Sequence, residues 1–193
     1  MVTSKPTNTE VPAFRTITNP VSNDKVVFLE TSRESNGRHT LLEITLAAKG
    51  GSFLRCYENF SEELLCLEGE LSVQIGNRTS QLMPGHSATA SARRKHRFFN
   101  HTSEPCRFQC RITPGCPGIE QSLQITYGLI RAGKANAHGV PRNLFERSYL
   151  MMISGTCLPG WMAALQPVLP WLAKQAIHNG RAADLQRRYF TVW

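Results

Sequence analysis

Short runs of β-branched and apolar residues, separated by turn-forming residues, fill the chain from residue 13 to residue 116. The runs include FRTITN, KVVFLETS, HTLLEITLA, GSFLRCY, LSVQIG, HRFFN and CRFQCRITP. Dipeptides such as Asn19-Pro20 and Pro84-Gly85 interrupt them, and residues of these types favour turns. Many short strands with regular turns are typical of a β-sandwich or a β-barrel. We therefore predict one mainly β domain over residues 13–116.

The pattern changes after this domain, where apolar residues recur at helical intervals. The first predicted helix, within residues 119–139, carries Leu123, Ile125, Tyr127, Leu129 and Ile130. A second helix is predicted to begin near Pro141, because proline suits the first turn of a helix. A third is predicted within residues 158–180 and a short fourth within residues 180–193. Together they make residues 117–193 a C-terminal helical extension.

One face of the third predicted helix is apolar and has no obvious partner in its own segment. Its members are Trp161, Leu165, Val168, Leu169, Leu172 and Ala176. Pro167 and Pro170 must kink or interrupt the helix, since proline removes a helical hydrogen bond. We expect this face to pack on the β domain or across a homodimer. At the other end of the chain, residues 1–12 are polar and rich in Thr and Pro, which predicts a flexible tail.

Two segments of the β domain keep the spacing of a pair of known motifs. In the first segment, Glu62 is followed after six residues by Gly69; in the second, Gly85, His96 and Asn100 are spaced as G-x10-H-x3-N. The chain resembles the cupin family, whose motifs run G-x5-H-x-H-x4-E-x6-G and G-x5-P-x-G-x2-H-x3-N. The resemblance implies a jelly-roll β-barrel and, in most members, a bound metal.

The principal metal ligands of the first motif are replaced in this chain. Arg55 and Tyr57 stand where the two histidines belong, so only Glu62 and His96 keep ligand chemistry. Arginine is a permanent cation without a lone pair to donate, and tyrosine binds a metal only as phenolate. We therefore expect no cofactor at the usual metal position. The alternative is a divalent transition metal at an atypical site built from Glu62, His96 and Tyr57, with Cys66 as a further candidate donor.

Strand alternation combined with the resemblance places the candidate ligand-binding residues. Arg55 and Tyr57 share one strand face, because successive side chains point to opposite faces. The expected interior pocket contains Arg55, Tyr57, Glu62 and His96, with Cys66 and Phe98 as neighbours. No catalytic residue is assigned from the sequence.

The role of Arg55 has two interpretations at this point. Its planar fork suits a ligand carboxylate or phosphate, and it equally suits a structural ion pair with Glu62 in the place of the metal. The basic run from Arg93 to Arg97 is open in the same way. It is either a solvated loop or a ring of charge at the pocket mouth that attracts anions.

Composition bounds the partners. The chain has 22 Lys and Arg against 14 Asp and Glu, a formal net charge of +8, which favours anionic partners. No recognisable nucleic-acid motif or broad basic surface is present, so we expect no nucleic acid. Nothing in the sequence is long and apolar enough to cross a bilayer. The six cysteines form no C-x-x-C pair and the N-terminus has no apolar signal run, which predicts a cytoplasmic protein with reduced thiols.

Three functional classes fit these observations. The first is a small-molecule-binding cupin without the usual metal, whose pocket takes a carboxylate or a phosphate. The second is a metal-dependent cupin enzyme, a dioxygenase or an isomerase, with an atypical site. The third is an interaction protein in which the barrel is a scaffold. Arg55 favours the first class, because a cation in the pocket attracts an anionic ligand.

Overall fold

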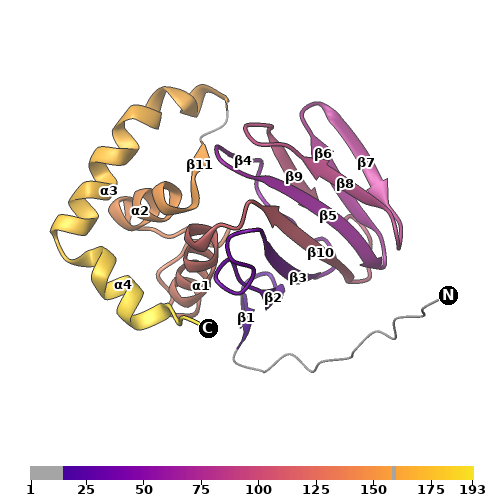
Figure 1. Cartoon of the computed structure of the whole chain (residues 1–193), viewed down its shortest axis with the longest axis horizontal. Helices are drawn as coiled ribbons and strands as arrows, with labels where there is room; N and C mark the ends of the chain where they lie inside the picture. The colour runs from indigo at the N-terminus through magenta and orange to yellow at the C-terminus, as the bar shows by residue number, and fades with distance from the viewer. Residues whose placement is uncertain (1–14, 158–159) are drawn as a thin grey trace.

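Two antiparallel sheets face each other and form a β-barrel of jelly-roll type, as the sequence predicts (Figure 1). The computed structural model describes residues 15–157 and 160–193. The larger sheet has the order β1 (Thr16–Thr18), β2 (Lys25–Glu30), β3 (Thr40–Leu46), β10 (Cys106–Thr113), β5 (Ser61–Glu68), β8 (Ser87–Ala90). The smaller sheet has the order β7 (Arg78–Leu82), β6 (Leu71–Ile75), β9 (His96–Phe99). A two-residue strand, β4 (Cys56–Tyr57), pairs with β11 (Thr156–Cys157) beside them.

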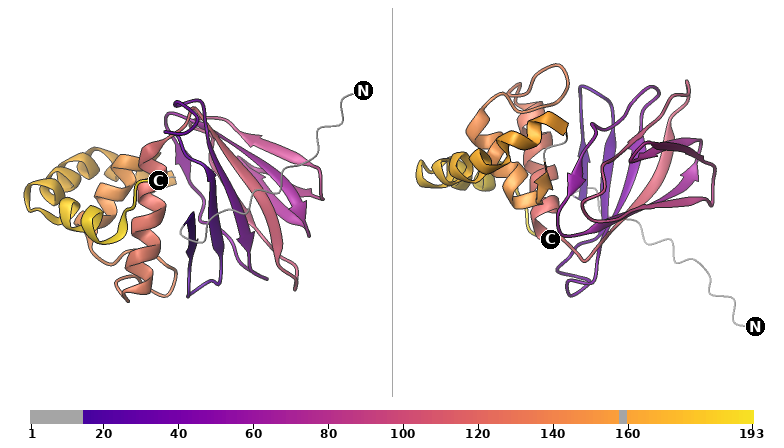
Figure 2. Two further views of the ribbon diagram at one scale, coloured as in Figure 1. Left: turned by 60° about the horizontal axis from the view of Figure 1, so that its bottom comes forward. Right: turned by 90° about the horizontal axis from the view of Figure 1, so that it is seen from above.

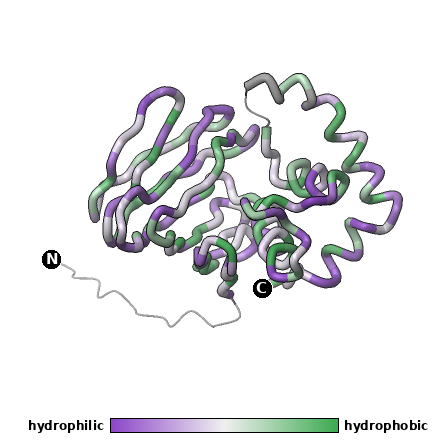
Figure 3. The backbone as a smooth tube through the Cα atoms, turned by 180° about the vertical axis from the view of Figure 1, so that it is seen from behind, coloured by the Kyte–Doolittle hydropathy of each residue, from purple (hydrophilic) through white to green (hydrophobic). Residues whose placement is uncertain are grey.

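The alternation of buried and partly exposed residues explains why these segments form strands. In β3 and in β10 every second side chain is buried, as expected of a sheet with one face on the core. Phe28, Leu64 and Phe108 are fully buried between the sheets, and hydrophobic and hydrophilic positions alternate along the barrel strands in Figure 3. The barrel therefore has a continuous apolar core into which the few inward-pointing polar residues project.

The run GSFLRCY is less regular than the sequence predicts. Only Cys56 and Tyr57 form a strand, while Gly51 and Arg55 make isolated bridges to Phe99 and His96 of β9. A Cβ on Gly51 would lie 2.8 Å from the Cβ of Phe99, so this crossing is too close for any residue but glycine. The bridge at Arg55 matters most, because it fixes Arg55 directly beside His96.

The helical extension lies on one side of the barrel (Figure 2), as the sequence predicts. Its elements are α1 (Pro117–Arg131), α2 (Leu144–Ser154), the 3-10 helix η2 (Gly160–Val168), α3 (Leu169–His178) and α4 (Arg181–Tyr189). Helix α1 contacts the barrel core through Ile119, Leu123 and Tyr127. Its other face carries Ile125 and Leu129. These side chains form a second apolar cluster with residues of α2, α3 and α4: Tyr149, Leu150, Ala173, Ala176, Ala182 and Leu185. The extension thus packs on the barrel through α1, and α3 packs on its fellow helices.

The prediction of one continuous apolar helix face within residues 158–180 is partly wrong. Leu172 and Ala176 are buried, but Val168 is 46% exposed. The physical reason is the 3-10 helix that contains Pro167, since three residues per turn shift the phase of the residues before α3. The side chains of Trp161 and Leu165 lie outside the described residues, as does the predicted flexible tail, residues 1–12.

One pair of cysteines contradicts the prediction of reduced thiols. Cys56 of β4 is joined to Cys157 of β11 in a disulfide, with 5.3 Å between their Cα atoms. Strand pairing brings together two residues that are 101 positions apart in the sequence, which spacing alone does not reveal. The described cysteines Cys66, Cys106, Cys110 and Cys116 are free. Among the described residues, no helix is long and apolar enough to cross a membrane.

Candidate functional site

The inner faces of both sheets contribute to a charged cluster inside the barrel. Glu62 comes from β5 in the larger sheet, and His96 comes from β9 in the smaller sheet. Arg55 joins them because its backbone N–H and C=O bond to those of His96, at 2.9 and 2.8 Å. Directly opposed residues of neighbouring strands point to the same face. The register therefore aims Arg55 and His96 at Glu62 across the barrel.

Glu62 and His96 form the centre of this cluster. The Nε2 atom of His96 is hydrogen-bonded to the Oε2 atom of Glu62, and the two residues are 2% and 3% exposed. The Nδ1 atom of His96 donates to the backbone carbonyl of Arg94 at 2.9 Å. Both ring nitrogens are thus occupied. The imidazole is held in one orientation from its two sides.

Arg55 reaches the same carboxylate from the neighbouring position. Its Nη2 atom lies 3.6 Å from the Oε1 atom of Glu62, and the guanidinium lies 4.9 Å from the ring centre of Phe98 and 5.5 Å from that of Tyr57. Such cation–π contacts stabilise a cation that has lost water. The buried Nε atom of Arg55 has no hydrogen-bond partner, and the side chain is 21% exposed. Arg55 therefore has donor capacity that the protein does not use.

Glu62 lies between two basic side chains. His96 is hydrogen-bonded to one oxygen of its carboxylate, and Arg55 lies near the other oxygen. Burial alone would raise the pKa of the Glu62 carboxyl, but the charge of Arg55 and the bond from His96 outweigh it and lower that pKa. The anionic form of Glu62 is therefore favoured. Arg55 shares this anion with His96.

Tyr57 forms an uncharged wall of the cluster. Its ring stacks on Phe60 with 4.4 Å between centroids and lies 5.9 Å from the ring of His96. Burial raises the pKa of the Tyr57 phenol above its ordinary value. Tyr57 is thus a neutral phenol at any physiological pH, with an apolar body and a polar tip.

Cys110 belongs to the cluster, although the sequence analysis did not identify it. Its thiol lies 3.6 Å from the Oε1 atom of Glu62, and burial raises its pKa well above the usual value. The signal was the alternation in β10, which buries Cys106, Phe108, Cys110 and Ile112 on the inner face. Cys66 does point inward, but its thiol contacts the backbone carbonyls of Glu68 and Gly69. No described contact links Cys66 to Arg55, Glu62 or His96.

Comparisons with known proteins identify the domain that contains this cluster. The family model described as "Cupin domain" matches residues 43–112, a region that holds all six residues of the expected pocket. The chain therefore contains a cupin domain. A search of curated proteins found no match.

Solved cupin structures resemble the barrel at low identity. KdgF from a Halomonas species is 10% identical, with a TM-score of 0.45 over 49% of this chain and 81% of that one. A predicted oxalate decarboxylase from Thermotoga maritima is 14% identical, with a TM-score of 0.47 over 51% of this chain and 90% of that one. A sugar phosphate isomerase of the cupin superfamily from Silicibacter pomeroyi is 22% identical, with a TM-score of 0.41 over 47% of this chain and 59% of that one. Similarities at this level support no conclusion about ligand or reaction.

The residues at the usual cupin metal position do not fit a metal ion. Glu62 and His96 are hydrogen-bonded to each other through atoms that would otherwise be free to bind a metal. Tyr57 keeps its phenolic proton. Arg55 places a cation where the cupin motif has its first ligand. Within the part of the chain that the structure describes, no group of three or more His, Cys, Asp or Glu side chains is arranged to hold a metal. A stable transition-metal site needs about three or four such donors. The donor set therefore opposes a metal here.

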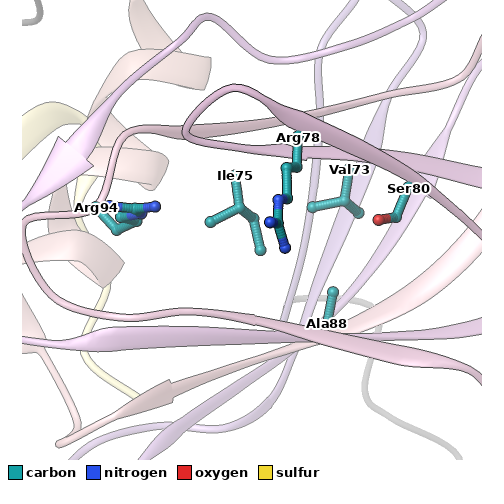
Figure 4. A pocket seen from close by; sticks show the side chains of 6 residues that line it. All are labelled: Val73, Ile75, Arg78, Ser80, Ala88 and Arg94. Carbon is teal, nitrogen blue, oxygen red and sulfur yellow. The ribbon is translucent and has the colours of Figure 1, made fainter.

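A hollow of about 490 Å³ opens between side chains of β6, β7 and β8 (Figure 4). It is lined by Val73, Ile75, Arg78, Ser80, Ala88 and Arg94. Of the basic run that the sequence analysis singled out, Arg94 lines this hollow. Arg97 points to the opposite face of β9, where its Nε atom donates to Gln74 at 2.7 Å and its guanidinium lies 5.1 Å from the ring of Phe99.

Proposed function

We propose that this cupin is a small-molecule-binding protein that takes an anionic ligand, a carboxylate or a phosphate, in its barrel without the usual metal. The observation that carries the proposal is the incomplete pairing of Arg55: one contact of 3.6 Å joins it to Glu62, and its buried Nε donor has no hydrogen-bond partner. A buried charge is costly unless a counter-charge or hydrogen bonds compensate it. An anion bound at Arg55 supplies both.

The contacts of Arg55 favour a ligand over a purely structural ion pair. A guanidinium that serves only as a structural partner is expected to face its carboxylate in a fork, with two short hydrogen bonds. Here one contact of 3.6 Å joins Arg55 to Glu62, and the carboxylate gives its shorter bond to His96. Glu62 thus orients Arg55 and leaves the buried Nε donor without a partner.

The uncharged residues around Arg55 suit the organic part of such a ligand. Phe98 and Tyr57 place aromatic rings against the guanidinium, and both rings are buried in the barrel core. Small-molecule sites in proteins are mostly apolar, with a few polar groups that fix orientation. This arrangement has one fixed cation within an aromatic surface, which matches a small organic anion better than a bare inorganic ion.

A thermal-shift screen of carboxylates and phosphates at constant ionic strength tests the proposal. We expect at least one small carboxylate or phosphate to raise the melting temperature of the wild-type protein. Arg55→Ala should abolish that stabilisation, and Arg55→Lys should restore it only in part, because lysine lacks the planar fork. Arg97→Ala is the matched control, since it removes the same charge from the opposite face of the sheet.

Two results would refute the proposal. One is a wild-type protein whose melting temperature no anion changes, with Arg55→Ala simply less stable, which would make Arg55 a structural ion pair. The other is an equal loss of anion response in Arg55→Ala and Arg97→Ala, which would show a general effect of net charge. The second functional class, a metal-dependent enzyme, has no favouring observation in the donor set described above.

A further inference from the structure

The hollow between β6, β7 and β8 contains a second concentration of positive charge. Arg78 of β7 and Arg94, which precedes β9, both line it, and both are exposed. Neither guanidinium makes an ion pair or a hydrogen bond with any described residue, and no acidic residue lines the hollow. Figure 4 shows both guanidiniums next to Ile75. The hollow therefore holds two cations that the described part of the protein does not neutralise.

The strand register relates this hollow to the Arg55 cluster. Arg78 is paired with Ile75, Ile75 with His96, and His96 with Arg55. These four residues form one transverse row across the smaller sheet. Paired residues share a face, and neighbouring strands lie about 4.8 Å apart. Arg78 and Arg55 are thus at the two ends of a row of inward-facing side chains, roughly 14 Å apart at the backbone.

The backbone around Arg94 is fixed by hydrogen bonds. The amide of Arg94 donates to Ser91 at 3.0 Å, and its carbonyl accepts from His96 Nδ1 at 2.9 Å. The amide of Gly76, in the β6–β7 turn, donates to the carbonyl of Lys95 at 2.7 Å. Gly76 has a φ of +60°, and a Cβ there would lie 3.3 Å from Nη2 of Arg94. The turn and the loop therefore hold Arg94 beside the strand pair that carries Arg78.

The chemistry of two guanidiniums selects among anions. A carboxylate has two oxygens, which a single guanidinium fork satisfies. A phosphoryl group has three terminal oxygens and close to two negative charges at neutral pH. It can therefore accept hydrogen bonds from two arginines. The remaining lining, Val73, Ile75 and Ala88, is apolar and suits a carbon skeleton.

We infer that Arg78 and Arg94 form a phosphoryl-binding subsite that takes the phosphate group of a small phosphate monoester, with its organic part against Val73, Ile75 and Ala88. The inference goes beyond the proposed function, because it assigns a second anion position and names its ligand chemistry. It rests on residues other than Arg55. The two positions can therefore be tested separately on the full-length protein.

Calorimetric titration with inorganic phosphate and with glycerol phosphate, at constant ionic strength, tests the subsite. We expect Arg78→Ala and Arg94→Ala each to weaken phosphate binding about tenfold or more, since a charge-assisted hydrogen bond contributes at least that much. Arg78→Lys should recover part of the loss. In Arg55→Ala, the titration should still show phosphate binding that Arg78→Ala and Arg94→Ala remove. Arg97→Ala is the charge-matched control, and acetate is the control ligand that one guanidinium satisfies.

Each alternative outcome has a distinct meaning. If the Arg78→Ala, Arg94→Ala double variant binds phosphate as the wild type does, or if the wild type binds no phosphate, the subsite does not exist. If phosphate binding is lost in Arg55→Ala and kept in the double variant, phosphate binds at Arg55, so the subsite is wrong while the proposed function stands. An equal loss in Arg97→Ala would mean a general charge effect. Both arginines are exposed, and circular dichroism checks that the variants fold.

Discussion

Replacing Glu62 by glutamine tests the charge arrangement of the cluster while keeping its shape. The substitution removes the acceptor of the His96 bond and the counter-charge of Arg55. Hydrogen bonds to charged groups contribute about 1.5–3 kcal/mol, and loss of one partner of a buried ion pair costs about 3–5 kcal/mol. The glutamine oxygen still accepts one hydrogen bond, so we expect a loss near the lower bound, about 3 kcal/mol.

Urea unfolding monitored by tryptophan fluorescence at pH 7.5 measures this loss, and a thermal scan should show a decrease of about 6–12 °C for a chain of this size. Glu63→Gln is the matched control. Glu63 is the next residue of β5 and is exposed on the outer face, so its substitution should change stability by less than about 0.5 kcal/mol. The comparison separates the effect of the buried charge from the effect of a Glu to Gln change in this strand.

The pH dependence gives an independent check of the same reasoning. The pKa of Glu62 is lowered in the folded protein from its ordinary value of 4.5. A lowered pKa means that the stabilisation is fully present above pH 4.5 and is lost as the pH falls through the folded-state pKa. The stability difference between wild type and Glu62→Gln should therefore shrink as the pH falls below about 4.5. A Glu62→Gln protein as stable as Glu63→Gln at pH 7.5 would refute the charge arrangement.

Two further predictions concern metal content and the disulfide. Protein purified without added metal or chelator should contain well under one equivalent of Fe, Mn, Ni, Cu or Zn by elemental analysis, because the donors of Glu62 and His96 bind each other; stoichiometric metal that disappears in His96→Ala would contradict this. Intact mass under non-reducing conditions should show one disulfide, absent in Cys56→Ala. Closing a loop of this length contributes about 4–5 kcal/mol in the chain-entropy account, so a reductant should lower the urea midpoint of wild type but not of Cys56→Ala.

Motif spacing and strand alternation were sufficient to predict the barrel and most of the cluster. Arg55, Glu62, His96 and Phe98 point inward because the period of a strand is two and the barrel has one inner face. The same alternation applies to Cys110, which was missed because no motif position drew attention to β10. Cys66 points to the same inner face as Glu62 but does not contact the cluster. Strand alternation fixes the face to which a side chain points, and not its position along the barrel axis.

Features that depend on contacts between distant segments could not be predicted in the same way. The disulfide between Cys56 and Cys157 arises from the pairing of β4 with β11, and these two-residue strands have no recognisable pattern. The exposure of Val168 follows from a 3-10 helix, whose period differs from the α-helical one assumed for its segment. The hollow depends on which side chains meet between β6, β7 and β8, so the sequence indicated a basic run without showing which of its members faces inward.

This chain has Arg55 where the cupin motif has a metal-binding histidine, and this difference changes what the barrel can recognise. A bound metal supplies positive charge together with open coordination positions, and its occupancy depends on metal supply and on pH. A guanidinium supplies one charge that no physiological pH removes, with donors in a fixed plane. Glu62 and His96 then bind each other instead of a metal, and Glu62 orients Arg55. Recognition of an anion at Arg55 should therefore persist in the presence of chelators and weaken as salt screens the charge, whereas recognition through a metal would respond to chelators first.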